Sequence, residues 1–228
     1  MSSTSGCIEK IEFGPAVSPW QATKQKFPLM QYIIITWKTG RQTKILPSIL
    51  NYGESRDVLC GTDVATNKES DVVVKMQTWR WHAESNGHEF DIANRIMKFC
   101  TPNFYGVHRV AYETRYAGYN VTYDLSVSVV EKVPRTMKDY TTTMLASPVT
   151  YYTMHMIYTW VRSLLELVYV ICEELKMRAS DFHSENIGLA DDHKLLVIDC
   201  ESITDGAALK PKERAKKGVK DFFTKLEF

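Results

Sequence analysis

The sequence predicts an α+β protein with two unlike lobes, a β-rich N-terminal lobe and a truncated, mainly helical C-terminal lobe. Up to Val133 the chain consists largely of short runs of β-branched and aromatic residues separated by polar turns. After Pro134 apolar residues recur at helical spacing instead. The two periods differ because side chains alternate along a strand but repeat about every 3.6 residues along a helix. At 228 residues the chain is long enough for one compact domain or one bilobal fold.

The composition is that of an ordinary globular protein and excludes several classes. Apolar residues make up 44%, charged residues 24%, and the formal net charge is +1, so overall charge favours neither nucleic-acid nor membrane binding. The five cysteines are scattered without a C-x-x-C pair, which favours thiols in a reducing compartment. No signal peptide is recognised, and Arg162 and Glu166 interrupt the longest apolar region, so no membrane span is expected. We therefore expect a cytoplasmic protein.

The N-terminal lobe is expected over residues 28–133, after an irregular arm at 1–27. Runs rich in β-branched and aromatic residues predict its strands, which cover 31–37, 42–46, 58–64, 72–76, 107–116 and 123–133. One helix is predicted over 88–99, because its apolar residues have near-helical spacing and Pro102 follows.

Residues 134–150 are expected to link the lobes, and a minimal C-terminal lobe should span 151–228. Apolar residues at helical spacing predict a long amphipathic helix whose buried face comprises Ile157, Val161, Leu164, Leu165, Val168, Ile171, Cys172 and Leu175. The basic run at 210–217, followed by apolar residues, favours a final amphipathic helix with a solvated polar face. A nuclear-localisation or nucleic-acid patch is the alternative for that run.

The most informative segment covers residues 181–199. Asp181 is followed five residues later by Asn186, and Asp199 ends a short hydrophobic strand thirteen residues further on. Residues 187–198 have the pattern strand, polar turn, strand, so a hairpin would bring Asn186 and Asp199 side by side. Carboxylate and amide oxygens are ligands for Mg²⁺, and this spacing is typical of a kinase catalytic loop and its metal-binding aspartate.

With this motif, residues 50–205 resemble the protein-kinase superfamily, which implies ATP and Mg²⁺ as cofactors. Residues 72–75, Val-Val-Val-Lys, are similar to the family's V-A-I-K strand, so Lys75 would hold the α- and β-phosphates. Glu89 would pair with that lysine, and Glu84 and Asp91 compete for this role.

The resemblance also assigns the remaining nucleotide contacts. Residues 129–133 resemble the hinge, so backbone groups of Glu131 and Val133 would take the adenine. Gly53 and Val58 fall in a reduced glycine-rich loop that retains a single glycine.

The catalytic loop is assigned in the same way. Asp181 falls at the catalytic aspartate, and Asn186 and Asp199 fall at the two metal ligands. His183 is either a residue that positions substrate or phosphate, or a histidine that packs the loop.

The chain also departs from the family pattern. Ala179 and Ser180 stand where a histidine and an arginine usually precede the catalytic aspartate, Cys200-Glu201 replaces the end of D-F-G, and no A-P-E follows. The form D-x-H-x-x-N is similar to aminoglycoside-type phosphotransferases and to compact kinases of some bacteriophages and bacterial effectors. This resemblance implies a compact atypical kinase of viral, phage or effector type, acting in the cytoplasm or in a host's cytoplasm or nucleus.

Three functions remain open. The first is a minimal protein kinase that phosphorylates a protein substrate, with Ser/Thr favoured over Tyr. Such a kinase would be either constitutively competent or dependent on a regulatory or docking partner. The second is a pseudokinase that acts as a binding module, and the third is a small-molecule phosphotransferase. The protein kinase is favoured because the chain retains the whole set of kinase site residues: Lys75, Glu89, Asp181, Asn186 and Asp199.

Overall fold

The structure is a computed structural model of the 228-residue chain. It describes residues 7–17, 27–52, 56–78, 101–116, 118–146, 148, 150–179, 185–190, 194–200, 203–210, 213 and 216. The chain divides into two compact units: unit 1 comprises Met1–Phe90 and Asn103–Lys132, and unit 2 comprises Asp91–Pro102 and Val133–Phe228.

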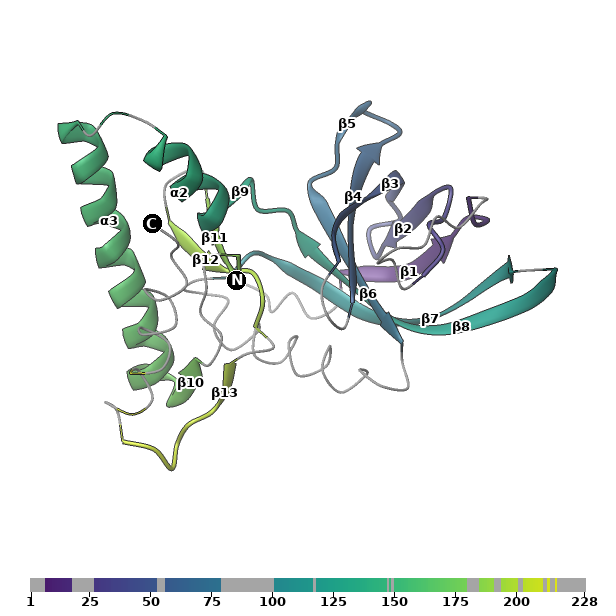
Figure 1. The fold of residues 1–228 in the computed structure, drawn as a ribbon. Helices are drawn as coiled ribbons and strands as arrows, with labels where there is room; N and C mark the ends of the chain where they lie inside the picture. The colour runs from purple at the N-terminus through teal and green to yellow at the C-terminus, as the bar shows by residue number, and fades with distance from the viewer. Residues whose placement is uncertain are drawn as a thin grey trace. The chain divides into compact units, whose positions relative to one another are not determined.

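Unit 1 contains an antiparallel eight-stranded sheet (Figure 1). Its strands are β1 (Ile8–Phe13), β2 (Ile33–Trp37), β3 (Gln42–Tyr52), β4 (Asp57–Asp63), β5 (Lys68–Glu69), β6 (Val72–Thr78), β7 (Phe104–Tyr116) and β8 (Tyr119–Glu131). They follow the order β1-β2-β3-β4-β6-β8-β7, with β5 paired to β4. The two edge strands meet at one end, where the Cys7 N–H donates to the Tyr105 carbonyl at 3.1 Å.

One face of this sheet forms the core of unit 1. Alternate residues of neighbouring strands point into it, as expected for a pleated sheet with one face fully buried. Its fully buried members include Ile33, Ile35, Leu59, Val74, Met76, Leu125, Val127 and Val129. The predicted strands in this part of the chain are confirmed, and several of them are longer than expected because pairing continues through polar residues.

The expectation of an irregular arm over residues 1–27 is wrong for Ile8–Phe13, which form β1 and pair with β2. Ile8 and Ile11 are only 2% and 6% exposed, although residues three apart on a regular strand point to opposite faces. A register shift between Ile8 and Lys10 brings both isoleucines to the buried side. This irregularity hides the strand from a search for regular alternation.

In its described part, unit 2 contains two α-helices, one π-helix and two small sheets (Figure 1). The elements are β9 (Arg135–Thr136), α2 (Met137–Leu145), α3 (Tyr151–Tyr169), a π-helix (Val170–Glu174), β10 (Met177–Ala179), β11 (Ile187–Leu189), β12 (Leu195–Val197) and β13 (Ile203–Asp205). One sheet has the order β12-β11-β9 and the other pairs β10 with β13. No helix in the described part of the chain is both long and apolar enough to cross a membrane.

The expectation of a linker over residues 134–150 is wrong for β9 and α2. The Thr136 N–H and hydroxyl donate to the Asp139 carboxylate at 3.2 and 2.7 Å, and the Asp139 N–H donates to the Thr136 hydroxyl at 3.1 Å. This reciprocal pair is a capping box that begins α2. The T-x-x-D spacing is a signal that could have found the helix, but threonine-rich sequences have low helix propensity.

The long helix that was expected to start at Ile157 is confirmed, but it begins earlier, at Tyr151. Its buried face is also rotated about the helix axis relative to the expected face. Thr150 caps it through a second capping box with Thr153. Met156, Trp160 and Leu164 are buried, whereas Leu165, expected in the core, is 51% exposed. The predicted helix over 88–99 and most of the predicted final helix lie outside the described residues.

Candidate functional site

Lys75 lies in the middle of β6, which pairs with β4 on one side and with β8 on the other. In the sheet register it pairs with Val58 of β4 on one side and with Ser128 of β8 on the other. Its neighbours Val74 and Met76 belong to the core of unit 1, so alternation places the Lys75 side chain on the opposite face. Lys75 is only 8% exposed, which is uncommon for a lysine.

Three polar residues of β6 and β8 lie near Lys75 on that opposite face. Together with Lys75 they form what we call the polar strip: Lys75, Gln77, Ser126 and Ser128. The register pairs Lys75 with Ser128 and Gln77 with Ser126, and all four side chains are buried. The Ser128 hydroxyl finds no hydrogen-bond partner among the described residues. Sequence reasoning missed the two serines, although their alternation with valine in a buried strand is a readable signal.

The segment expected to act as a hinge lies at the boundary between the units, which falls between Lys132 and Val133. The N–H groups of Glu131 and Lys132 donate to the carbonyls of Asn103 and Asp71 at 2.8 and 2.7 Å. Among the described backbone groups no partner is found for the Val133 N–H.

The Glu131 side chain has a structural role. One of its carboxylate oxygens accepts from the backbone N–H and the side-chain amide of Asn103 at 3.0 and 2.8 Å. These bonds join the last residue of β8 to the residue that precedes β7.

Asn186 and Asp199 lie at the open end of the β11–β12 hairpin. The strands pair with Ile187 opposite Val197, and the Ile198 N–H donates to the Asn186 carbonyl at 3.0 Å. The predicted hairpin is thus confirmed, and it brings the residue before β11 close to the residues that follow β12. Both Asn186 and Asp199 are partly buried.

Gly188 allows this hairpin to pack closely. A Cβ atom at this position would lie 2.6 Å from Cγ1 of Val133 and 2.8 Å from Cγ2 of Ile198. Gly188 also pairs with Thr136 of β9, so the hairpin is held from both sides. An amide and a carboxylate on such a fixed support suit Mg²⁺, which binds through one or two protein oxygens and keeps several waters or phosphate oxygens.

Four residues of the expected site lie outside the described residues: Gly53, Glu89, Asp181 and His183. Within the described residues, the structure groups Lys75 with Val58 in unit 1, and Asn186 with Asp199 in unit 2. Among the described side chains no cluster of three or more His, Cys, Asp and Glu could hold a metal. The described cysteines are free thiols, as expected.

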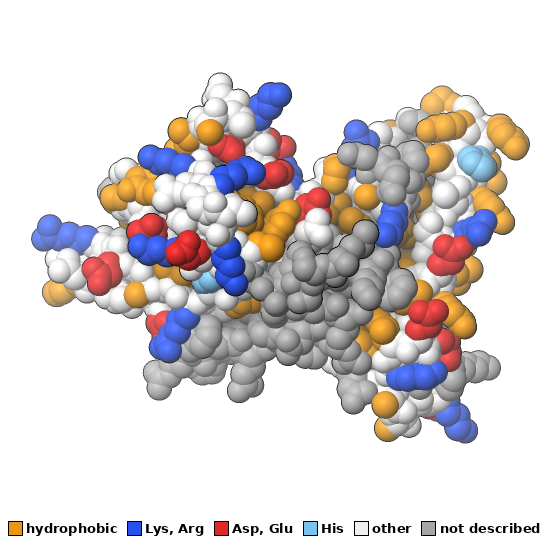
Figure 2. Space-filling model, turned by 180° about the vertical axis from the view of Figure 1, so that it is seen from behind, with side chains coloured by type: hydrophobic (Ala, Val, Ile, Leu, Met, Phe, Trp, Pro, Cys, Tyr) orange, Lys and Arg blue, Asp and Glu red, His pale blue; other side chains and the backbone are white. Residues whose placement is uncertain are grey.

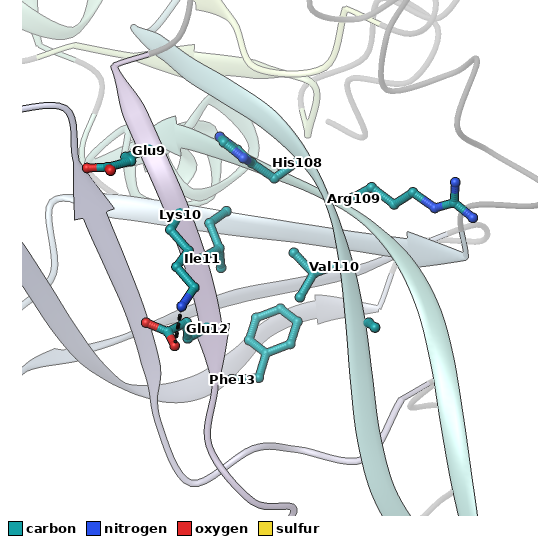
Figure 3. Close-up of a pocket in the computed structure, with 9 residues that line it drawn as sticks. Glu9, Lys10, Ile11, Glu12, Phe13, His108, Arg109 and Val110 are labelled. Atoms are coloured by element: carbon teal, nitrogen blue, oxygen red, sulfur yellow. Dashed lines mark hydrogen bonds and ion pairs between the residues drawn. The ribbon is translucent and has the colours of Figure 1, made fainter.

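A cavity of about 500 Å³ lies between the edge strands β1 and β7 (Figure 3). Ion-paired Lys10 and Glu12 line its β1 side, and His108 and Arg109 line its β7 side. Burial, helped by the positive charge of Lys38, lowers the pKa of His108. None of the residues expected to bind ATP or metal lines this cavity.

Comparison with solved structures shows that the chain has a protein-kinase-like fold with a β-rich N-terminal lobe. Among solved structures, the chain is similar to the ROP18 kinase domain in complex with AMP-PNP and sucrose, with a TM-score of 0.54 and 13% sequence identity. The likeness covers 75% of this chain and 55% of that one, so the chain spans just over half of the kinase structure. No protein-family model and no curated protein sequence matches the chain.

Proposed function

We propose that this protein is an ATP- and Mg²⁺-dependent phosphotransferase, a minimal bilobal protein kinase that transfers the γ-phosphate to a Ser or Thr hydroxyl of a protein substrate. The observation that carries the proposal is the position of Asn186 and Asp199 at the end of one hairpin in a kinase-like fold. The kinase structure with AMP-PNP supports a nucleotide as ligand.

In this proposal Asn186 and Asp199 hold the metal. Bound Mg²⁺ neutralises negative charge on the phosphates, which is the main electrostatic requirement of phosphoryl transfer. The hairpin keeps the two oxygen ligands at a fixed spacing, because β11 and β12 pair directly and Gly188 admits their close packing. This support limits the rearrangement that metal binding would need.

In unit 1, Lys75 would bind the α- and β-phosphates and Glu89 would orient it. The position of Lys75 in the middle of β6, opposite Val58 of β4 and Ser128 of β8, supports this role. Val58, next to Lys75 in the register, would contact the nucleotide together with Gly53. The backbone of Val133 would donate to the adenine, and Glu131 would contribute through its carbonyl.

Asp181 would accept the proton of the substrate hydroxyl, and His183 would position substrate or phosphate. In this proposal the C-terminal lobe is minimal, and a docking partner supplies part of the surface that binds the protein substrate. A compact atypical kinase of viral, phage or effector type remains our family proposal.

A pseudokinase is the second candidate. It is favoured by the hydrogen bonds that already occupy the N–H groups of Glu131 and Lys132 and leave fewer donors for an adenine. A small-molecule phosphotransferase is the third, supported by the D-x-H-x-x-N form of the catalytic loop.

The decisive test compares wild type with Asp199→Asn, which removes the charge of the proposed metal ligand at nearly constant volume. We expect transfer of radiolabelled phosphate from ATP to fall at least about 10³-fold, and the Mg²⁺-dependent part of the ATP-induced rise in Tm to disappear. Glu174→Gln, which neutralises an exposed carboxylate of unit 2, is the matched control and should keep both signals.

The acceptor separates the three candidates. Label in protein supports the kinase, and label in small acceptors alone supports the small-molecule enzyme. A Mg²⁺-independent shift in Tm without any transfer supports the pseudokinase. Full transfer by a folded Asp199→Asn protein would overturn the phosphotransferase proposal.

A further inference from the structure

Helix α3 is apolar on two opposite faces, only one of which is buried within its own unit. The buried face includes Met156, Trp160 and Leu164, and the ring of Trp160 packs edge-on against Tyr140 of α2 at 4.5 Å between ring centroids. A helix that is hydrophobic all round normally has partners all round. The other apolar face of α3 is exposed.

We call this second face the outer stripe. Large apolar side chains that are exposed form it: Tyr151, Met154, Tyr158, Leu165 and Tyr169. Successive members are separated by three, four or seven residues, so they align along one side of the helix. Figure 2 shows hydrophobic side chains along the outer side of this helix, at the right of the view.

The outer stripe is large enough for a specific interface. Tyr151, Tyr158 and Tyr169 are 90%, 66% and 59% exposed. Since an aromatic side chain presents roughly 150–250 Å², the five residues expose on the order of 600 Å². A standard interface buries about 800 Å² per partner, so this stripe supplies most of that area. Tyrosine and methionine are also enriched in interface cores.

Charge on α3 favours a second copy of the same helix as the partner. The Lys, Arg, Asp and Glu residues of α3 are limited to Arg162 and Glu166, which pair with each other at 2.9 Å. Two copies that meet along this helix therefore bring no net repulsion. A partner with a strongly charged helix would gain nothing from such a neutral surface.

We propose that the outer stripe is a dimer interface, in which α3 of one copy of this chain packs against α3 of a second copy about a two-fold axis. Both copies contribute the same patch to such an interface, so each exposed tyrosine occurs in it twice, once from each copy. This dimer is independent of the proposed phosphotransferase activity.

Sedimentation equilibrium of the full chain tests the proposal with wild type, Tyr158→Glu and Tyr152→Glu. Tyr152 is the matched control, because it lies on the same helix and is 64% exposed, close to the 66% of Tyr158, but it follows Tyr151 by one residue and is therefore about 100° round the helix. We expect a wild-type dimer with a micromolar dissociation constant. Tyr158→Glu should raise that constant at least about thirtyfold, whereas Tyr152→Glu should change it less than threefold.

Circular dichroism confirms that each variant is folded, and Leu165→Glu repeats the test at a second position of the stripe. A wild-type protein that remains monomeric up to about 100 μM, well above the expected constant, overturns the proposal. A dimer that Tyr158→Glu and Leu165→Glu leave intact overturns it as well.

Discussion

Gly188 shows at the level of one residue how the candidate metal site depends on close packing. Because Gly188 has no side chain, the side chains of Val133 and Ile198 can lie close to the backbone of β11. The sequence places a glycine at this position, but only the fold reveals which neighbours require it.

Gly188→Ala should therefore destabilise the protein by about 1–3 kcal/mol, because the new Cβ would overlap the side chain of Val133 at 2.6 Å. Urea unfolding measures this change. Val133→Ala should make room for the methyl group, so the double variant should lose less than the sum of the two single losses. An unchanged midpoint for Gly188→Ala would show that Val133 and Ile198 leave room for a methyl group at this position.

His108 should make the stability of unit 1 depend on pH. Burial, together with Lys38, lowers its pKa in the folded state below the ordinary value of 6.5. The unfolded state then binds the proton more readily, so this contribution to stability is complete above pH 6.5 and is lost as pH falls below it through the depressed pKa. Wild type should lose more stability than His108→Gln between about pH 7 and pH 5.

Unfolding free energies of both proteins, measured across that pH range, check this prediction. Parallel pH profiles would mean that His108 titrates alike in the folded and unfolded states.

At the scale of the elements, helix caps decide where the helices of unit 2 begin. The Thr153 N–H donates to the Thr150 hydroxyl at 3.2 Å, and the Thr150 N–H donates to the Thr153 hydroxyl at 2.8 Å. Both bonds satisfy groups that the first turn of α3 would otherwise leave without a partner.

Thr150→Ala should cost about 1 kcal/mol, because it removes the N-cap acceptor. Thr159→Ala is the control, since the Thr159 hydroxyl only donates back to the His155 carbonyl at 2.9 Å within the same helix. Thermal unfolding should show a lower Tm for Thr150→Ala and an equal or higher Tm for Thr159→Ala. Equal losses in the two variants would contradict a specific capping role.

At the scale of the whole molecule, the proposed nucleotide site draws on residues of both units. Lys75 belongs to unit 1 and Asp199 belongs to unit 2. A ligand held by both should therefore slow backbone hydrogen exchange in both.

We expect ATP with Mg²⁺ to increase protection in peptides from β6 and from the β11–β12 hairpin, measured by mass spectrometry. Asp199→Asn should weaken the Mg²⁺-dependent protection in both peptides, because the nucleotide loses one of its anchors. Protection confined to unit 1 would mean that the hairpin takes no part in binding.

The sequence by itself determined the features that rest on local pattern and spacing. The run of β-branched residues from Val72 to Val74 predicted β6, and the polar turn between two short apolar runs predicted the hairpin that carries Asn186 and Asp199. These succeed because neighbouring residues alone set the periodicity of a strand and the reversal of a turn.

Only the tertiary structure decided the features that depend on distant partners. β1 could be assigned only from its bulged pairing with β2. Helix α3 is apolar on two faces, and it buries Leu164 and exposes Leu165 because the rest of unit 2 packs on one face alone. The sequence could not choose between those faces, since a period of 3.6 residues says that a face is apolar but not what lies against it. The burial of Lys75 and the commitment of the Glu131 N–H to Asn103 likewise depend on strands far away in the chain.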